Sequence, residues 1–180
     1  MTPDISGLLK LALVEDLGTP PRDITSEAVF SETQKQQSTA KIRSRCQGIL
    51  YGVEIAAAVF RSTDKSLKLT VLKQDGDVLQ KDDAVLQIRG NVLSLLKAER
   101  IALNLISHLS GIATLTRAYV DQIPQNSRAV LIDTRKTTPG MRHLEKMATR
   151  AGGAQNHRKG LYDGYLIKDN HIAASGSIKE

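Results

Sequence analysis

The last third of the chain follows a strand–helix–strand pattern, and this pattern limits the possible folds more than any other feature of the sequence. Thr138-Pro139 is typical of a helix start, because a hydroxyl can cap the helix and proline suits its first position. Gly152-Gly153 indicates the end of that helix. We therefore predict strands over 129–133 and 164–168 around a helix over 139–151. Such a βαβ unit places its two strands parallel, with a right-handed crossover, and indicates an α/β architecture.

The sequence before residue 111 is dominated by short segments in which apolar and polar side chains alternate, as in half-buried strands. Asn91 can cap a long helical pattern, which Ser110-Gly111 would interrupt. The predicted strands span 38–45, 48–51, 67–72 and 84–89, and the predicted helices span 5–17 (capped by Asp4 or Ser6, ended by Gly18), 54–61, Asn91 to Ser110 and 114–123, with a loop over 19–25. These elements indicate an α+β domain with a mostly antiparallel sheet.

A polar tetrad follows each predicted strand of the βαβ unit, Asp133-Thr134-Arg135-Lys136 after the first and Lys168-Asp169-Asn170-His171 after the second. Because parallel strands end at the same edge of a sheet, we expect both tetrads on one rim. The loop 155–159 should begin near the opposite rim unless it folds back. Clustered cations are costly to desolvate, so Arg135, Lys136 and Lys168 favour an anionic ligand such as a carboxylate or a phosphate. A solvated turn at Arg135-Lys136 is the competing interpretation.

Charge narrows the class of partner. The formal net charge is +6, and the stretch from 130 to 172 holds eight Arg and Lys residues against four acids. A basic excess suggests small anions or nucleic acid as partners. Aromatic side chains do not interleave with these cations, which disfavours a nucleic-acid surface. We therefore expect small anionic ligands.

The sequence offers little support for a metal site, a disulfide or a membrane-spanning segment. The single cysteine, Cys46, excludes an intrachain disulfide, and His143, His157 and His171 lack a standard zinc spacing, so we expect no metal ligands among them. His171 stays open between a catalytic and a structural role. No apolar run is long enough to span a membrane, and the N-terminus lacks the features of a signal peptide. We therefore expect a cytoplasmic protein.

Three long stretches resemble a known family. They are ERIALNLISHLSGIAT (99–114), DTRKTTPGMRHLEKMATRAGGAQNHRKGL (133–161) and LIKDNHI (166–172), and they resemble quinolinate phosphoribosyltransferase, the decarboxylating nicotinate-nucleotide pyrophosphorylase family. VEDLG (14–18) followed by DIT (23–25) resembles the N-terminal signature of that family, with Thr-Pro-Pro-Arg-Asp in place of its short Gly-Asp link. A molybdenum-transport-associated homologue shares DTRKT, but KDNHI fits the quinolinate enzyme better.

The resemblance implies an N-terminal open-faced α/β sandwich over residues 1–110, including a linking helix, and the first part of a type II phosphoribosyltransferase α/β barrel over 111–180. It implies that quinolinate and phosphoribosyl pyrophosphate become nicotinate mononucleotide, pyrophosphate and CO2, in de novo NAD biosynthesis and with Mg2+. The acids that bind the ribose and the metal are expected beyond residue 180. A non-catalytic truncated homologue is therefore the alternative function.

The resemblance also assigns residues to the substrates. Those that would hold the quinolinate carboxylates are Thr134, Arg135, His157, Arg158 and Lys168. Lys136 would face the phosphoribosyl or pyrophosphate oxygens, and Lys136 and Lys168 are the catalytic candidates. Arg100 would reach the site of the partner subunit in a homodimer.

Overall fold

The computed structural model describes residues 5–30 and 36–177. Its elements in chain order are α1 (Ser6–Leu17), α2 (Ile24–Val29), β1 (Gln37–Arg43), β2 (Gly48–Ile49), α3 (Val53–Thr63), β3 (Lys68–Val71), β4 (Val78–Leu79), β5 (Ala84–Asn91), α4 (Val92–Val120), α5 (Arg142–Ala151) and α6 (Asp169–Ser175). Gly18 ends α1 as predicted, with a left-handed φ of 74°. The cap position of α1 is Ile5, without a side-chain hydrogen bond, and Asp4 lies outside the described residues.

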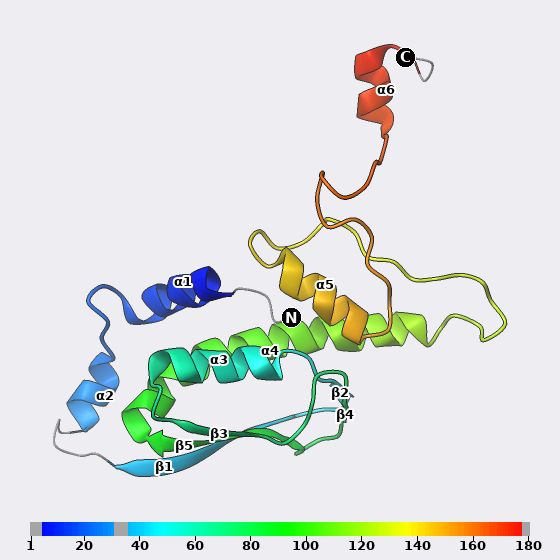
Figure 1. Cartoon of the computed structure of the whole chain (residues 1–180). Coiled ribbons are helices and arrows are strands. Elements are labelled where there is room, and N and C mark those ends of the chain that lie inside the picture. The colour runs from blue at the N-terminus through cyan, green and yellow to red at the C-terminus, as the bar shows by residue number, and fades with distance from the viewer. Residues whose placement is uncertain (1–4, 31–35, 178–180) are drawn as a thin grey trace.

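The first half of the chain forms an antiparallel sheet with the strand order β1-β5-β3, beside a two-stranded ribbon of β2 and β4. The helices α3 and α4 lie over one face of the sheet (Figure 1). Exposed and partly buried residues alternate along β1, as expected for a strand with one covered face. The prediction of an open-faced, mostly antiparallel α+β unit is therefore confirmed. Helix α2, with Asp23 as its cap, was not predicted.

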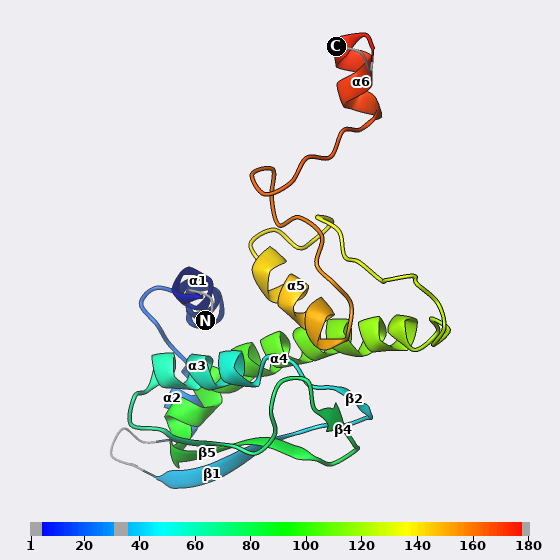
Figure 2. The same ribbon diagram turned by 45° about the vertical axis from the view of Figure 1, so that its right-hand side comes forward.

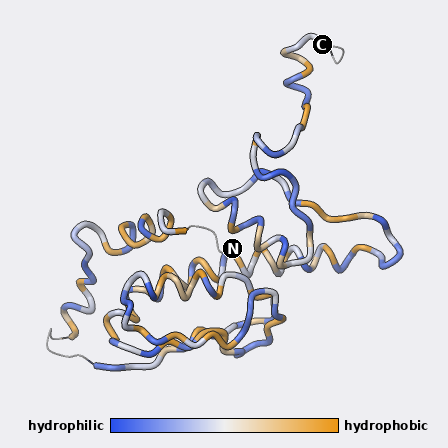
Figure 3. Tube along the Cα trace, in the orientation of Figure 1, coloured by the Kyte–Doolittle hydropathy of each residue, from blue (hydrophilic) through white to orange (hydrophobic). Residues whose placement is uncertain are grey.

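The hydrophobic core lies between the sheet and the two helices. Leu86 and Ile88 of β5 are completely buried, and they belong to the same core cluster as the apolar residues of α3. Figure 3 shows the apolar positions concentrated in this layer. The buried residues that α3 and α4 contribute include Val53, Ala56, Ala57, Val59, Phe60, Ala98, Ala102 and Leu109. Many of them are small, which lets the helices approach closely.

Helix α4 runs without interruption from Val92 to Val120, so the predicted break at Ser110-Gly111 is wrong. Asn91 caps it as predicted, because its Oδ1 accepts the N–H of Leu93 at 2.9 Å. The helix continues through Gly111 because buried residues on both sides, Leu109 and Ala113, keep one face packed. Tertiary packing outweighs the modest cost of one glycine in a helix.

The predicted βαβ unit is partly wrong. Residue Ile132 forms a parallel bridge with Gln155, and the segment 164–168 forms no strand. The helix between them begins at Arg142, three residues later than predicted, because Gly140 has a left-handed φ of 79° that a helix cannot contain. The chain therefore turns back directly after α5 and brings residues 155–158 to the first extended segment.

Residues 161–168 are exposed, and α6 lies apart from the rest of the molecule (Figures 1 and 2). His171 caps this helix, since its Nδ1 accepts the backbone N–H of Lys168 at 3.0 Å. The expectation that the Asp133 and Lys168 tetrads share one rim is not met in this structure. The physical reason is that the parallel neighbour of the first segment comes from residue 155 and not from residues 164–168.

Candidate functional site

Asp133 is the centre of the candidate site, and both of its carboxylate oxygens are occupied. Its Oδ1 accepts from Lys146 Nζ at 2.5 Å and from the backbone N–H of His157 at 2.8 Å. Its Oδ2 accepts from Asn156 Nδ2 at 2.7 Å. A carboxylate with three donors is satisfied, so Asp133 organises the site and is not available to a further cation.

Lys146 is buried in the middle of α5 and links three segments of the chain. Besides its ion pair with Asp133, its amino group donates to the carbonyl oxygen of His157 at 3.0 Å. Asn156 Nδ2 in turn donates to the carbonyl oxygen of Lys146 at 2.8 Å. A buried lysine is tolerated where a carboxylate and further acceptors satisfy it. This network fixes residues 155–158 beside the Asp133 segment.

The loop 134–138 presents two cations beside this network. Thr134 Oγ1 accepts the backbone N–H of Lys136 at 3.0 Å, which is a short side-chain turn, and Arg135 accepts the N–H of Thr137 at 3.0 Å. The Nε of Arg135 is buried, and no described residue accepts its proton. Lys136 is exposed, and its amino group has no acceptor among residues 5–30 and 36–177. Both cations are therefore free to bind an anion.

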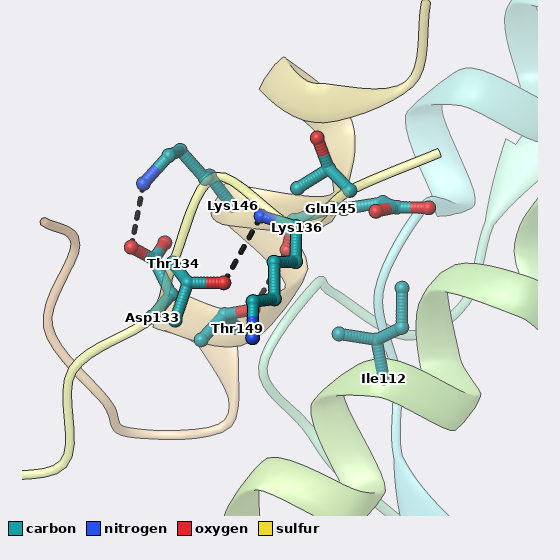
Figure 4. Close-up of a pocket in the computed structure, with 8 residues that line it drawn as sticks. Ile112, Asp133, Thr134, Lys136, Glu145, Lys146 and Thr149 are labelled. Carbon is teal, nitrogen blue, oxygen red and sulfur yellow. Dashed lines mark hydrogen bonds and ion pairs between the residues drawn. The ribbon is translucent and has the colours of Figure 1, made fainter. Parts of the chain in front are cut away.

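A cavity of about 210 Å³ lies between this loop, α4 and α5 (Figure 4). Figure 4 shows the Lys146 amino group directed at Asp133, whereas the side chain of Lys136 points in another direction. The residues that line the cavity are Ile112, Asp133, Thr134, Lys136, Thr137, Glu145, Lys146 and Thr149. Its two acids are already hydrogen bonded, so Lys136 and the hydroxyl groups give it the character of an anion site.

Glu145 is the second acid of the cavity, and it connects α5 to α4. Its Oε1 lies 2.9 Å from His108 Nε2, and its Oε2 accepts the backbone N–H of Thr138 at 3.1 Å. Burial by itself raises the pKa of Glu145, but the hydrogen bonds from Thr138 and His108 lower that pKa by more, so the net shift is downward. Glu145 therefore stays ionised at neutral pH.

The structure brings most of the predicted site residues together. Thr134, Arg135 and Lys136 lie on one loop, and His157 is tied to the same Asp133. His157 Nδ1 accepts the backbone N–H of Arg158 at 2.6 Å. The Arg158 guanidinium donates to the carbonyl oxygen of Gly164 at 2.9 Å. The loop 155–159 does not start near the opposite rim: it folds back, which is the alternative that the sequence left open, because Gln155 bridges Ile132 and the His157 N–H donates to Asp133.

Two predicted residues lie elsewhere. Lys168 sits at the start of α6, away from the Asp133 network (Figure 2). Arg100 is exposed on α4, twelve residues before the cavity residue Ile112, or about 18 Å along the helix axis. Neither residue touches the cavity within this chain.

Four residues of the network were not predicted from the sequence: His108, Glu145, Lys146 and Asn156. Lys146 was counted only as one more cation of the basic stretch, and His108 lies outside that stretch. The one available signal is that Asn156 stands beside His157 and Arg158 in QNHRK. Their roles depend on how α4 packs against α5, which a pattern of residue types does not encode.

An antiparallel α+β unit, joined by one long helix to a segment that holds a cationic cavity, defines an α/β protein with a candidate site for small anions. Two family models narrow this class. The N-terminal domain of quinolinate phosphoribosyl transferase matches residues 23–110, and the C-terminal domain of the same family matches residues 112–180. The chain belongs to the quinolinate phosphoribosyltransferase family.

Individual relatives agree with this assignment. A probable nicotinate-nucleotide pyrophosphorylase (carboxylating) of Bacillus subtilis is 47% identical over 96% of this chain and 58% of its own length. The corresponding chloroplastic protein of Arabidopsis thaliana is 40% identical over 98% of this chain and 49% of its own length. The chain thus spans about half the length of these curated relatives.

Solved structures confirm the α/β fold class. NadC from Streptococcus pyogenes superposes with a TM-score of 0.90 at 42% identity, over 99% of this chain and 63% of that chain. The nicotinate-nucleotide pyrophosphorylase of Ehrlichia chaffeensis gives a TM-score of 0.91 at 37% identity, over 99% of this chain and 64% of that chain. The division at residue 110 stays a prediction, because α4 passes through it.

Proposed function

We propose that this chain belongs to an enzyme that transfers a phosphoribosyl group from phosphoribosyl pyrophosphate to quinolinate, with release of pyrophosphate and CO2 and formation of nicotinate mononucleotide, in NAD biosynthesis in the cytoplasm. The observation that supports it most directly is the pair Arg135-Lys136 beside a cavity whose acids are already paired. The relatives, which are nicotinate-nucleotide pyrophosphorylases and quinolinate phosphoribosyltransferases, favour quinolinate over a molybdenum-related role.

The negative charges of the substrates explain why the assigned residues are mostly cationic. Quinolinate is a dianion and phosphoribosyl pyrophosphate a polyanion, so a cradle of cations is needed to hold them together. Thr134, Arg135, His157 and Arg158 are assigned to the quinolinate carboxylates, and Lys136 to the phosphate or pyrophosphate oxygens. Fixed cations also stabilise the negative charge that develops when pyrophosphate and CO2 leave.

Lys168 and Arg100 do not contact the cavity in this structure, so each would bind substrate only in another arrangement of the chain or in a dimer. Lys168 joins the site only if the segment 161–175 folds back toward the cavity. Arg100 is too far along α4 to reach the cavity of its own chain, which supports its assignment to the site of the other subunit in a homodimer. Both remain substrate-binding residues in the proposal, and Lys136 and Lys168 are its catalytic residues.

The proposed Mg2+ does not fit the described part of the chain. No group of three His, Cys, Asp or Glu residues that could hold a metal occurs within the described residues. Asp133 is occupied by Lys146, Asn156 and the His157 N–H. The metal is therefore assigned to phosphoribosyl pyrophosphate and to residues beyond 180.

Calorimetric titration of the chain with quinolinate tests the proposed cradle. Loss of one charged hydrogen-bond partner costs about 1.5–3 kcal/mol, so Arg135→Ala should weaken quinolinate binding by about 10-fold to 100-fold. Lys136→Ala should weaken the binding of pyrophosphate by a similar factor, because Lys136 is assigned to the phosphate oxygens. Lys81→Ala, an exposed cation on a turn of the N-terminal unit, is the matched control and should bind like the wild type. Unchanged affinity in Arg135→Ala would refute the cradle.

A second measurement separates the enzyme from its alternatives. Release of CO2 from quinolinate that depends on phosphoribosyl pyrophosphate and Mg2+ identifies the enzyme, whereas quinolinate binding without any turnover identifies a non-catalytic homologue.

None of the described helices combines the length and the apolar character needed to cross a bilayer. DNA binding that is tighter than quinolinate binding and sensitive to salt would contradict the proposal.

A further inference from the structure

The buried side chain of Glu145 bonds to two distant parts of the molecule. Its Oε2 accepts the backbone N–H of Thr138, at the end of the loop 134–138, and its Oε1 contacts His108 on α4. Glu145 itself belongs to the first turn of α5. One carboxylate therefore joins the long helix of the N-terminal half, the helix of the C-terminal half and the loop that carries Lys136.

Few other hydrogen bonds fix this loop against the helices. The bonds from Lys136 N to Thr134 Oγ1 and from Thr137 N to Arg135 O stay inside the loop. Within the described part of the chain, the side chains of α5 that bond the loop 134–138 are Glu145 and Arg142, whose Nε donates to Thr137 Oγ1 at 3.1 Å. The backbone N–H of Met141, directly before α5, also donates to the carbonyl oxygen of Thr138 at 3.0 Å. Apart from this backbone bond, the loop 134–138 is held against α5 largely by the side chains of Glu145 and Arg142.

The sign of its charge makes Glu145 unexpected at this position. It lines the same cavity as Lys136, where an ionised carboxylate would repel a bound anion. Figure 4 shows its carboxylate directed away from the side chain of Lys136. Both carboxylate oxygens of Glu145 already have partners, His108 and the backbone N–H of Thr138. The geometry therefore indicates that Glu145 holds the loop and does not contact the anion.

We propose that Glu145 is a positioning residue for anion binding: it holds the loop 134–138 so that Lys136 faces the cavity, and His108 orients its carboxylate. This inference rests on the proposed function, which assigns Lys136 to the phosphate oxygens. Glu145 acts through the loop and does not touch the substrates.

The test compares Glu145→Ala with Glu145→Gln in the full chain, with inorganic pyrophosphate as the probe. Loss of the anchoring hydrogen bond in Glu145→Ala should weaken pyrophosphate binding about tenfold. Glu145→Gln should bind within about threefold of the wild type, because its amide oxygen still accepts the Thr138 N–H. The control Glu54→Ala removes an exposed ion pair with Arg61 on α3 and should change nothing. Equal or tighter binding by Glu145→Ala would overturn the proposal.

Hydrogen exchange gives a second readout that requires no ligand. In Glu145→Ala the Thr138 amide should exchange at least about tenfold faster, while the His157 amide, held by Asp133, should not change. Unchanged protection of Thr138 would refute the anchoring role. If the wild type binds neither pyrophosphate nor quinolinate, the proposed function is wrong. Hydrogen exchange at the Thr138 amide still tests whether Glu145 anchors the loop, because it requires no ligand. If Glu145→Ala does not fold, His108→Ala should show the same two effects at smaller size, and no effect there would refute the role of His108.

Discussion

Lys146 and Asp133 form a buried ion pair in which Nζ and Oδ1 are 2.5 Å apart and the side chains are only 4% and 9% exposed. The pair joins α5 to the extended segment before the cationic loop, and Asn156 and His157 complete its hydrogen bonds. Because both carboxylate oxygens of Asp133 are satisfied from within the chain, the ion pair is a fixed structural support for the loop that carries Arg135 and Lys136.

Removal of Lys146 should destabilise the protein strongly. Lys146→Ala leaves the Asp133 carboxylate buried without its cation, and breaking a buried pair in this way costs about 3–5 kcal/mol of unfolding free energy. Urea denaturation followed by circular dichroism measures the loss. Lys159→Ala, which removes an exposed cation of the same region, should change the stability by less than about 0.5 kcal/mol. A loss below about 1 kcal/mol in Lys146→Ala would show that the pair is not a structural base.

Two glycines should respond to alanine in opposite directions. A Cβ at Gly152 would lie 2.5 Å from the carbonyl oxygen of Ala113 and 2.5 Å from Thr116 Cβ, so α4 and α5 would have to separate. We expect Gly152→Ala to lose about 1–3 kcal/mol. Gly111 lies inside α4 with open space around it, so Gly111→Ala should gain about 0.5–1 kcal/mol. Thermal unfolding of the two variants checks both signs, and a stabilised Gly152→Ala would contradict the close packing of α4 and α5.

The carboxylate of Asp75 should make the stability depend on pH in the acid range. Its Oδ1 accepts the N–H groups of Gly52 and Val53 at 2.8 Å and 2.9 Å, at the start of α3. Burial raises the pKa of Asp75 above its usual 3.8, and the two hydrogen bonds offset this only in part. The folded state therefore holds the proton more tightly, so this contribution to stability is present below 3.8 and is lost as the pH rises through the raised pKa.

Asp75→Asn keeps an oxygen acceptor but does not titrate. The melting temperature of Asp75→Asn relative to the wild type should therefore rise as the pH increases above 3.8, and it should level off above the raised pKa of Asp75. Differential scanning calorimetry at several pH values measures the difference. A difference that is constant or falls across this range would show that ionised Asp75 is not penalised by burial.

The cap of the long helix gives a further test. Asn91 accepts from Leu93 at 2.9 Å and from Ser94 at 3.4 Å, which satisfies two of the free N–H groups at the start of α4. Asn91→Ala should cost about 1 kcal/mol of unfolding free energy in urea denaturation. Asn104→Ala, at an exposed position inside the same helix, should be neutral or slightly stabilising. Equal effects at the two positions would mean that the cap contributes nothing.

Local signals in the sequence predicted most of the first half correctly. Gly18 ends α1, Asn91 starts α4, and the alternating segments around Leu69 and Ile88 form β3 and β5. Each of these features depends on neighbours within a few residues, such as a capping oxygen or a glycine with positive φ. The break predicted at Gly111 was wrong because α4 is held by its contacts with α3 and α5 and not by its own propensity.

The candidate site also has features that the sequence determines and features that only the tertiary structure determines. The sequence by itself determined which cations follow the apolar run, and it predicted an anionic ligand for Arg135 and Lys136, because charge and hydrophobicity are properties of the residues. Tertiary structure alone decided which distant segment lies beside these cations. Gly153, at φ 102°, turns the chain back after α5. Asn156 and His157 therefore reach Asp133, whereas Lys168 does not. It also buried Lys146 and Glu145 between α4 and the cationic loop. The physical reason is that pairing between remote segments depends on the packing of whole helices, which no local pattern of side chains specifies.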